Sequence, residues 1–79
     1  MDSAAQGRRF YEAKRAGVKL HLVRKGMTEG HAERWLWAWE GSWHAMPYEL
    51  YSAAFWDRGL RWIEAAAAGG QEPPAVGDR

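Results

Sequence analysis

Hydrophobic side chains recur at helical spacing in the second half of the chain and predict two helices there. The first is expected over residues 28–45, because Thr28 is a residue type that favours the N-cap of a helix. The second is expected over residues 47–68, since Pro47 suits a first helical turn and Gly69–Gly70 suit a helix end. Pro47 also limits the connection to a tight corner, so the two helices are expected to form an antiparallel hairpin.

The N-terminal part predicts a further helix over residues 4–16. Ser3 and Gln6 form a capping-box pattern, in which the Ser3 hydroxyl accepts from a backbone N–H of the first turn and the Gln6 side chain reaches back to accept from the Ser3 N–H. Gly17 is a residue type that commonly follows the last turn of a helix. The hydrophobic face of this helix is thin, with Phe10 as its main member.

Residues 18–24 fit two structures. Val18, Leu20 and Leu22 alternate with polar residues, which is typical of a strand. A short helix would instead direct Val18, Leu22 and Val23 inward. Both alternatives stay open, and we slightly favour the helix because nothing else in the chain resembles a strand that could pair with this one.

Together these patterns predict an all-α fold. A small three-helix domain over residues 1–68 is expected to be built on the Trp-rich hairpin and to begin with a basic helix. Residues 69–79 combine glycines and prolines with a single large hydrophobic side chain, Val76, and they predict a disordered C-terminal tail.

The composition changes the expected core. The 79 residues include six Trp, three Tyr and two Phe, but only nine Val, Ile and Leu, so aromatic rings must supply most of the buried surface. The chain has no cysteine, which excludes a disulfide framework, a thiolate zinc site and a cysteine nucleophile. No stretch reaches the roughly 18 hydrophobic residues of a membrane span, and no secretory leader opens the chain. We therefore expect a cytoplasmic protein that does not enter a membrane.

The hydrophobic arc of the third predicted helix is unusually wide. Its apolar residues cover roughly 200° of the helix surface, about twice what a helix on a protein surface needs. The thin first helix is not expected to cover all of it. We therefore predict a homodimer that buries Tyr51, Phe55 or Trp56 across a two-fold axis.

Trp37 does not fit the hydrophobic face of the second predicted helix. At about 100° per residue, Trp35 and Trp39 share a face, whereas Trp37 falls between Glu33 and Glu40 on the polar side. An exposed Trp is a frequent anchor of protein interfaces. Contact with another protein, cover by the N-terminal segment or the C-terminal tail, and simple exposure all remain open for Trp37.

Charge is unevenly distributed along the chain. Residues 1–25 carry seven basic and two acidic residues, a balance of +5, while the rest carries four basic and eight acidic residues, a balance of −4. The basic segment can bind phosphates of a nucleic acid, or it can pair with the acidic helices of its own fold. The candidate nucleic-acid-binding residues are Arg8, Arg9, Arg15, Lys19, Arg24 and Lys25.

The sequence from Ala13 to Lys25 resembles the small–x–x–Ala–Gly–Val turn of LacI-type helix-turn-helix domains. The resemblance covers 13 residues and implies a turn at Gly17, with Lys19, Leu20 and His21 at the start of a DNA-recognition helix. The segment departs from the family at Leu20 and at Leu22, where polar side chains usually meet DNA.

No pattern in the chain predicts catalysis. His21, His31 and His44 lack metal-ligand spacing, and no glycine-rich phosphate loop is present. Glu40 and His44 are four residues apart, a spacing that indicates a surface hydrogen bond more readily than a base and its orienting group. We expect a non-enzymatic protein without cofactor or metal.

The sequence therefore favours a small protein–protein interaction module, an adaptor or an inhibitor that binds a larger macromolecule through exposed aromatic surface. Its candidate protein-binding residues are Trp37, Tyr51, Phe55 and Trp56. The alternative is a nucleic-acid-binding protein that uses the helix-turn-helix-like residues 8–25. Salt separates the two, because phosphate binding weakens steeply with ionic strength and aromatic contacts barely respond.

Overall fold

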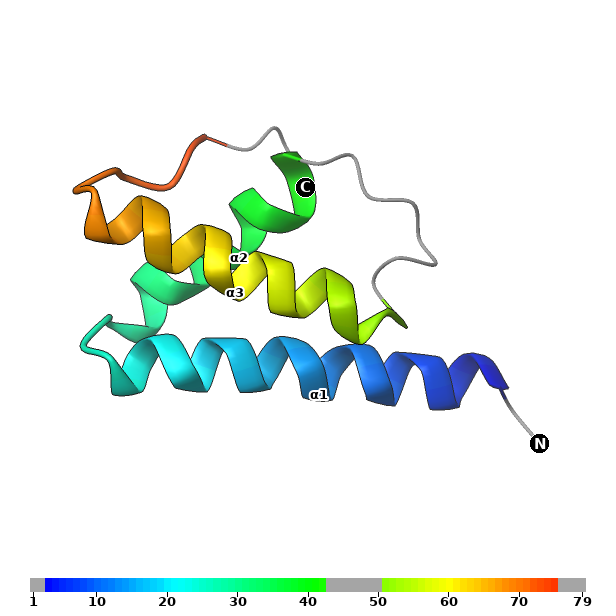
Figure 1. Ribbon diagram of the computed structural model, residues 1–79. Coiled ribbons are helices and arrows are strands. Elements are labelled where there is room, and N and C mark those ends of the chain that lie inside the picture. The colour runs from blue at the N-terminus through cyan, green and yellow to red at the C-terminus, as the bar shows by residue number, and fades with distance from the viewer. Residues whose placement is uncertain (1–2, 43–50, 76–79) are drawn as a thin grey trace.

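The computed structural model describes residues 3–42 and 51–75 of the chain and shows three helices packed against one another. They are α1 (Ser3–Arg24), α2 (Glu29–Ser42) and α3 (Ala53–Ala68), and the described residues contain no strand. In Figure 1, α1 and α3 run in the same general direction, and α2 returns behind α3 and crosses it obliquely. The all-α fold predicted from the hydrophobic pattern is confirmed.

Helix α1 is longer than the sequence predicts. It continues through Gly17, where the predicted helix ends, and includes all of residues 18–24, so the helical alternative for that segment is correct. The continuation is favoured because Val18 and Leu22 lie one turn apart and are both buried in the core. That burial outweighs the roughly 1 kcal/mol that a glycine costs inside a helix.

The actual end of α1 lies at Gly26, whose φ of 114° suits glycine. The Gly26 amide donates to the Val23 carbonyl oxygen at 3.0 Å, and the Met27 amide donates to the Leu22 carbonyl oxygen at 3.1 Å. This pair of hydrogen bonds is a Schellman motif, which satisfies the last carbonyl groups of the helix. The predicted helix end at Gly17 is therefore wrong, and Gly26 ends the helix instead.

Helix α2 begins where the sequence predicts. Thr28 Oγ1 accepts a hydrogen bond from the His31 amide at 3.1 Å, as an N-cap residue does. The helix is described as far as Ser42, so its predicted end near Ala45 lies outside the described residues.

Helix α3 begins later than predicted. Ser52 is its N-cap, with an extended backbone of φ −107° and ψ 127°, so Tyr51 and Ser52 lie before the helix. The predicted start at Pro47 lies outside the described residues. At its other end Gly70 has a φ of 79°, and a second Schellman motif joins Gly70 and Gln71 to the last turn of the helix. The predicted end at Gly69–Gly70 is confirmed.

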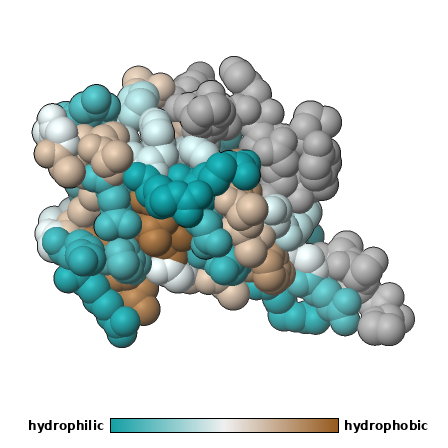
Figure 2. All heavy atoms as spheres, viewed as in Figure 1, coloured by the Kyte–Doolittle hydropathy of each residue, from teal (hydrophilic) through white to brown (hydrophobic). Residues whose placement is uncertain are grey.

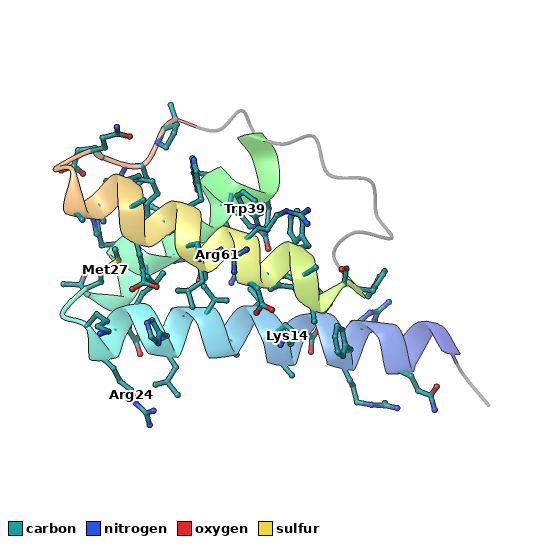
Figure 3. All side chains as sticks on the ribbon, in the orientation of Figure 1. Lys14, Arg24, Met27, Trp39 and Arg61 are labelled. Carbon is teal, nitrogen blue, oxygen red and sulfur yellow. The ribbon has the colours of Figure 1, made fainter. Side chains whose placement is uncertain are left out.

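Aromatic rings fill much of the space between the helices. Trp39 of α2 lies against Phe55 and Trp62 of α3, with ring centroids 4.9 Å and 5.6 Å apart, and Figure 3 shows it where α2 passes behind α3. Trp35 also meets Trp62, at 5.6 Å. The fully or nearly fully buried hydrophobic residues are Val18, Leu22, Ala32, Trp35, Leu36, Ala38, Trp39, Phe55, Trp56, Ile63 and Ala66.

Two residues predicted to face a partner protein belong to this core instead. Phe55 is 1% exposed and Trp56 is completely buried. The wide arc of α3 is covered from two sides, because Trp56 meets Tyr11 of α1 at 5.6 Å while Phe55 meets Trp39 of α2. Helix α1 covers more surface than predicted, because its buried residues Val18 and Leu22 lie beyond the predicted helix end. The predicted docking role of Phe55 and Trp56 requires surface exposure, which the folded chain does not give them.

The chain after α3 has no regular secondary structure over residues 71–75. The rest of the predicted disordered tail, residues 76–79, lies outside the described residues. Among the residues that the structure does describe, no helix has the length and hydrophobicity to cross a membrane.

Candidate functional site

The face of α2 that carries Trp37 is the candidate interaction surface. Trp35 and Trp39 point into the core, whereas Trp37 remains 44% exposed. This alternation follows from the 200° that separates residues two apart on a helix. The prediction that Trp37 lies apart from its two neighbours is confirmed.

The two glutamates that flank Trp37 on α2 bind basic side chains of α1. Arg15 Nε donates to Glu40 Oε1 at 2.7 Å, and both Nη groups of Arg15 donate to the Glu33 carboxylate. Tyr11 Oη donates to Glu40 Oε1 at 3.1 Å, and Lys19 Nζ lies 3.2 Å from Glu33 Oε2. We call these five residues the α1–α2 clamp. They fix the helix that bears Trp37 against α1.

The central ion pair of the clamp, Arg15 with Glu33, is charged at neutral pH. Hydrogen bonding from Arg15 lowers the pKa of the Glu33 carboxyl below its usual value, although burial opposes the shift. Burial alone would lower the pKa of Arg15, but its hydrogen bonds to Glu33 and Glu40 outweigh that effect and raise it. The Glu40 side chain is only 6% exposed, so its carboxylate depends on charged hydrogen bonds from within the fold.

The basic residues predicted to bind nucleic acid are not brought together. Arg15 and Lys19 pair with acidic residues of their own fold, which was the other alternative for this segment. The exposed Arg8 and Arg24 are 16 residues apart on α1, or about 24 Å along the helix axis. Figure 3 shows Arg24 pointing away from the other helices.

Of the remaining candidates, Arg9 is exposed beside Arg8 and Lys25 is exposed beside Arg24. The helix-turn-helix resemblance implies a turn at Gly17, and α1 passes through that residue without one. The structure therefore contradicts the implied arrangement of a recognition helix after Gly17.

The C-terminal segment lies beside Trp37. Pro73, Pro74 and Ala75 line a shallow hollow of about 280 Å³ together with Trp37 and Arg34. Cover by the C-terminal tail was one alternative for Trp37, and it holds in part, because almost half of the side chain is still exposed.

Tyr51 is the second predicted interface residue that the structure leaves exposed, at 46%. Its ring meets Tyr11 edge-on at 6.3 Å and lies over Gly7 of α1. Tyr11 in turn binds Glu40, which lies three residues beyond Trp37 on α2. A continuous path of contacts therefore connects Tyr51 to the turn of α2 that follows Trp37.

Two further hydrophobic residues of α1, Phe10 and Leu20, are exposed. Phe10 was taken as the main core residue of its helix, but it is exposed, while Tyr11 packs against the core. Leu20 is exposed as well. Once α1 is continued to Arg24, Tyr11, Val18 and Leu22 define its inner face, so a correct helix end would have revealed both residues.

In Figure 2, hydrophobic atoms appear where α3 meets α1, between hydrophilic side chains. A hollow of about 280 Å³ lies along this line and includes Val18, His21 and Leu60 among its lining residues. His21 Nε2 lies 3.6 Å from Glu64 Oε2, and His31 Nε2 accepts a hydrogen bond from Trp35 Nε1 at 3.2 Å. Neither histidine meets a nucleophile in these contacts.

Within residues 3–42 and 51–75, no three His, Cys, Asp or Glu side chains gather closely enough to hold a metal ion. The possible Glu40–His44 pair lies partly outside the described residues. Comparison of the chain with protein-family models, with curated proteins and with solved structures gives no match. The inference about function therefore rests on the side chains of the chain itself.

Proposed function

We propose that this chain is a non-enzymatic protein–protein interaction module, an adaptor or an inhibitor, that binds a larger protein through the face of α2 around Trp37. One observation carries the proposal: a large aromatic side chain remains 44% exposed although the three helices close their core without it. Tyr51, which is exposed and is connected to Glu40 of α2 through Tyr11, would extend the contact.

The exposed part of Trp37 is large enough to matter for binding. A Trp side chain can bury about 250 Å², so an exposure of 44% leaves about 110 Å² to be covered. At about 25 cal/mol per Å², covering it contributes about 3 kcal/mol, or roughly a hundredfold in the dissociation constant. This is the range of an interface hot spot.

The surroundings of Trp37 also suit an interface. Glu33 and Glu40 flank it, and the α1–α2 clamp holds them in position before a partner arrives. A central aromatic side chain with ordered polar neighbours is the usual arrangement of a binding hot spot. Because the helix is already ordered, little conformational entropy is lost on binding.

Self-association and location remain predictions. Tyr51 is the exposed member of the three residues proposed for a homodimer, so we expect any dimer to use Tyr51 and not Phe55 or Trp56. A chain without cysteine needs no oxidising compartment, and we expect it to act in the cytoplasm.

Affinity capture from a lysate of the host tests the function. The wild-type chain is expected to capture a protein from the lysate. Trp37→Ala should capture at least tenfold less of that protein, at both low and high salt. Leu20→Ala is the matched control, because it removes a comparably exposed hydrophobic side chain from α1 and should leave capture unchanged. Equal capture by the wild-type chain and Trp37→Ala contradicts the proposal. Capture of nucleic acid that disappears at high salt would favour the alternative function.

A further inference from the structure

The C-terminal segment returns to the interaction surface after α3 ends. The Gln71 amide donates to the Ala66 carbonyl oxygen at 3.0 Å, which completes the Schellman motif and reverses the chain. In Figure 1, the orange and red segment runs back above α3 toward α2. Residues 72–75 thereby reach Arg34 and Trp37, more than thirty residues earlier in the chain.

The contacts of this segment combine a charge and an apolar surface. Glu72 Oε2 lies 3.5 Å from an Nη group of Arg34, and Pro73, Pro74 and Ala75 line the hollow beside Trp37. Consecutive prolines are held in an extended conformation by their rings, so they lose little entropy when they dock. Grooves lined by aromatic side chains are a common way to bind such segments.

We propose that the surface formed by Arg34 and Trp37 recognises an extended acidic–proline segment of a partner protein, of the form Glu–Pro–Pro, and that the chain's own Glu72–Pro73–Pro74, which lies against this surface and forms one side of the hollow, blocks it until the partner displaces it. The inference rests on the proposed function of Trp37 and specifies the chemistry of its partner. The Arg34 guanidinium would pair with the acidic residue of the segment, and the Trp37 indole would pack against the prolines that follow it.

The resident segment is suited to displacement. The side chains of Arg34 and Glu72 are both largely exposed, and exposed ion pairs are weak. The segment is nevertheless favoured in the isolated protein, because its short connection to α3 gives it an effective concentration in the millimolar range. A partner segment must outcompete it, so the tail sets a threshold for binding.

A peptide titration on the full-length chain tests the proposal. The probe is a capped peptide of residues 70–77, and the readout is the indole N–H resonance of Trp37, identified by its loss in Trp37→Phe. In the variant with both Pro73→Ser and Pro74→Ser, the resident segment should detach from Arg34 and Trp37. This variant is expected to bind the peptide roughly tenfold more tightly than the wild-type chain, because competition by the tail is removed.

Charge reversal tests the ion pair. Using the double-serine chain in every arm, Arg34→Glu or a peptide with Glu72→Lys alone should weaken binding at least threefold. Combining the reversed chain with the reversed peptide should restore it. A peptide with both prolines replaced by serine is the control and should bind at least fivefold more weakly than the unchanged peptide.

Three results would overturn the inference: no binding to the double-serine chain at 2 mM peptide, equal affinity for that chain and the wild-type chain, or a Trp37 resonance that is identical in the two chains before peptide is added. If the lysate capture still depends on Trp37 in these cases, the proposed function stands without the proline chemistry. Conversely, peptide binding at Trp37 together with unchanged capture by Trp37→Ala would show that this surface binds the tail sequence, but it would defeat the proposed function and with it the partner that the inference names.

Discussion

Helices α2 and α3 pack closely at Gly59, and replacing this residue with alanine tests the arrangement of the core. A Cβ atom at Gly59 would lie 2.5 Å from Trp39 Nε1 and 2.7 Å from Trp39 Cε2, well inside van der Waals contact. The indole cannot easily move away, because Phe55 and Trp62 lie against it and the side chain is buried. Glycine at this position lets α3 approach the ring closely.

Two opposing effects decide the magnitude for Gly59→Ala. Alanine stabilises a helix by about 1 kcal/mol relative to glycine. Overpacking of a filled core costs about 1–3 kcal/mol, and a contact at 2.5 Å belongs at the upper end of that range. The net expectation is a loss of about 2 kcal/mol in the free energy of unfolding, or roughly 8–16 °C in melting temperature for a domain of this size.

Thermal and urea unfolding followed by circular dichroism measure this loss. Gly17→Ala is the matched control, because Gly17 also lies within a helix but a Cβ there would have no neighbour within 4 Å. That change should raise stability by up to about 1 kcal/mol. If Gly59→Ala is as stable as the wild-type chain, the close contact between α3 and Trp39 is wrong. If Gly17→Ala is destabilising, α1 does not continue through Gly17.

Four further substitutions test the assigned faces of α2 and the α1–α2 clamp. Trp37→Ala should leave the melting temperature within a few degrees of the wild-type value. Trp39→Ala should lower the free energy of unfolding by about 3–5 kcal/mol and unfold the domain. Equal losses of melting temperature in the two variants would contradict the assigned faces of α2. Arg15→Ala removes the guanidinium from the nearly buried Glu40 carboxylate. It should lower the free energy of unfolding in urea by about 2–3 kcal/mol. A change under about 0.5 kcal/mol would show that the clamp contributes little to stability. Because the folded-state pKa of Glu33 lies below its usual value of about 4.5, the stability that Glu33 contributes is present above that value and is lost as the pH falls through the lower, folded-state pKa. Unfolding measured between pH 3 and pH 6 should therefore show a shallower loss for Glu33→Gln than for the wild-type chain, and identical slopes would refute the assignment.

The sequence was most informative where side-chain periodicity alone decides the structure. The positions of Trp35, Trp37 and Trp39 follow from the helical repeat, and the structure buries the outer two and exposes the middle one as that repeat predicts. The start of α2 at Thr28 and the end of α3 at Gly69–Gly70 are likewise local signals. Local signals are reliable here because a hydrogen bond or a backbone conformation within a few residues satisfies them.

The first helix shows where local signals compete. Gly17 and Gly26 are both suitable helix ends, and only the burial of Val18 and Leu22 against the other helices selects the second. A first helix that ends at Gly17 is too short to cover the wide hydrophobic face of α3, so that face was expected to need a partner. The prediction that Phe55 and Trp56 face a partner followed from that missing surface.

Contacts between distant segments could not be derived from the pattern. The basic segment had two possible partners, a phosphate or an acidic helix, and the choice depends on the packing that brings Arg15 to Glu33 and Glu40. Likewise, composition predicted a tail without secondary structure but did not predict that Pro73 would lie beside Trp37. Both outcomes depend on the relative placement of helices, which a single sequence does not encode in any local signal.

In the proposed function, Trp37 contributes to binding a partner protein and not to the stability of the fold. Its most direct test is the dissociation constant of the purified complex with the captured partner, measured by calorimetry for the wild-type chain and for Trp37→Ala, beside the melting temperatures of both free chains. Our account predicts at least a tenfold weaker complex, little changed between low and high salt, with nearly equal melting temperatures. Equal dissociation constants, or a weaker complex that is explained by an unfolded variant, would contradict it.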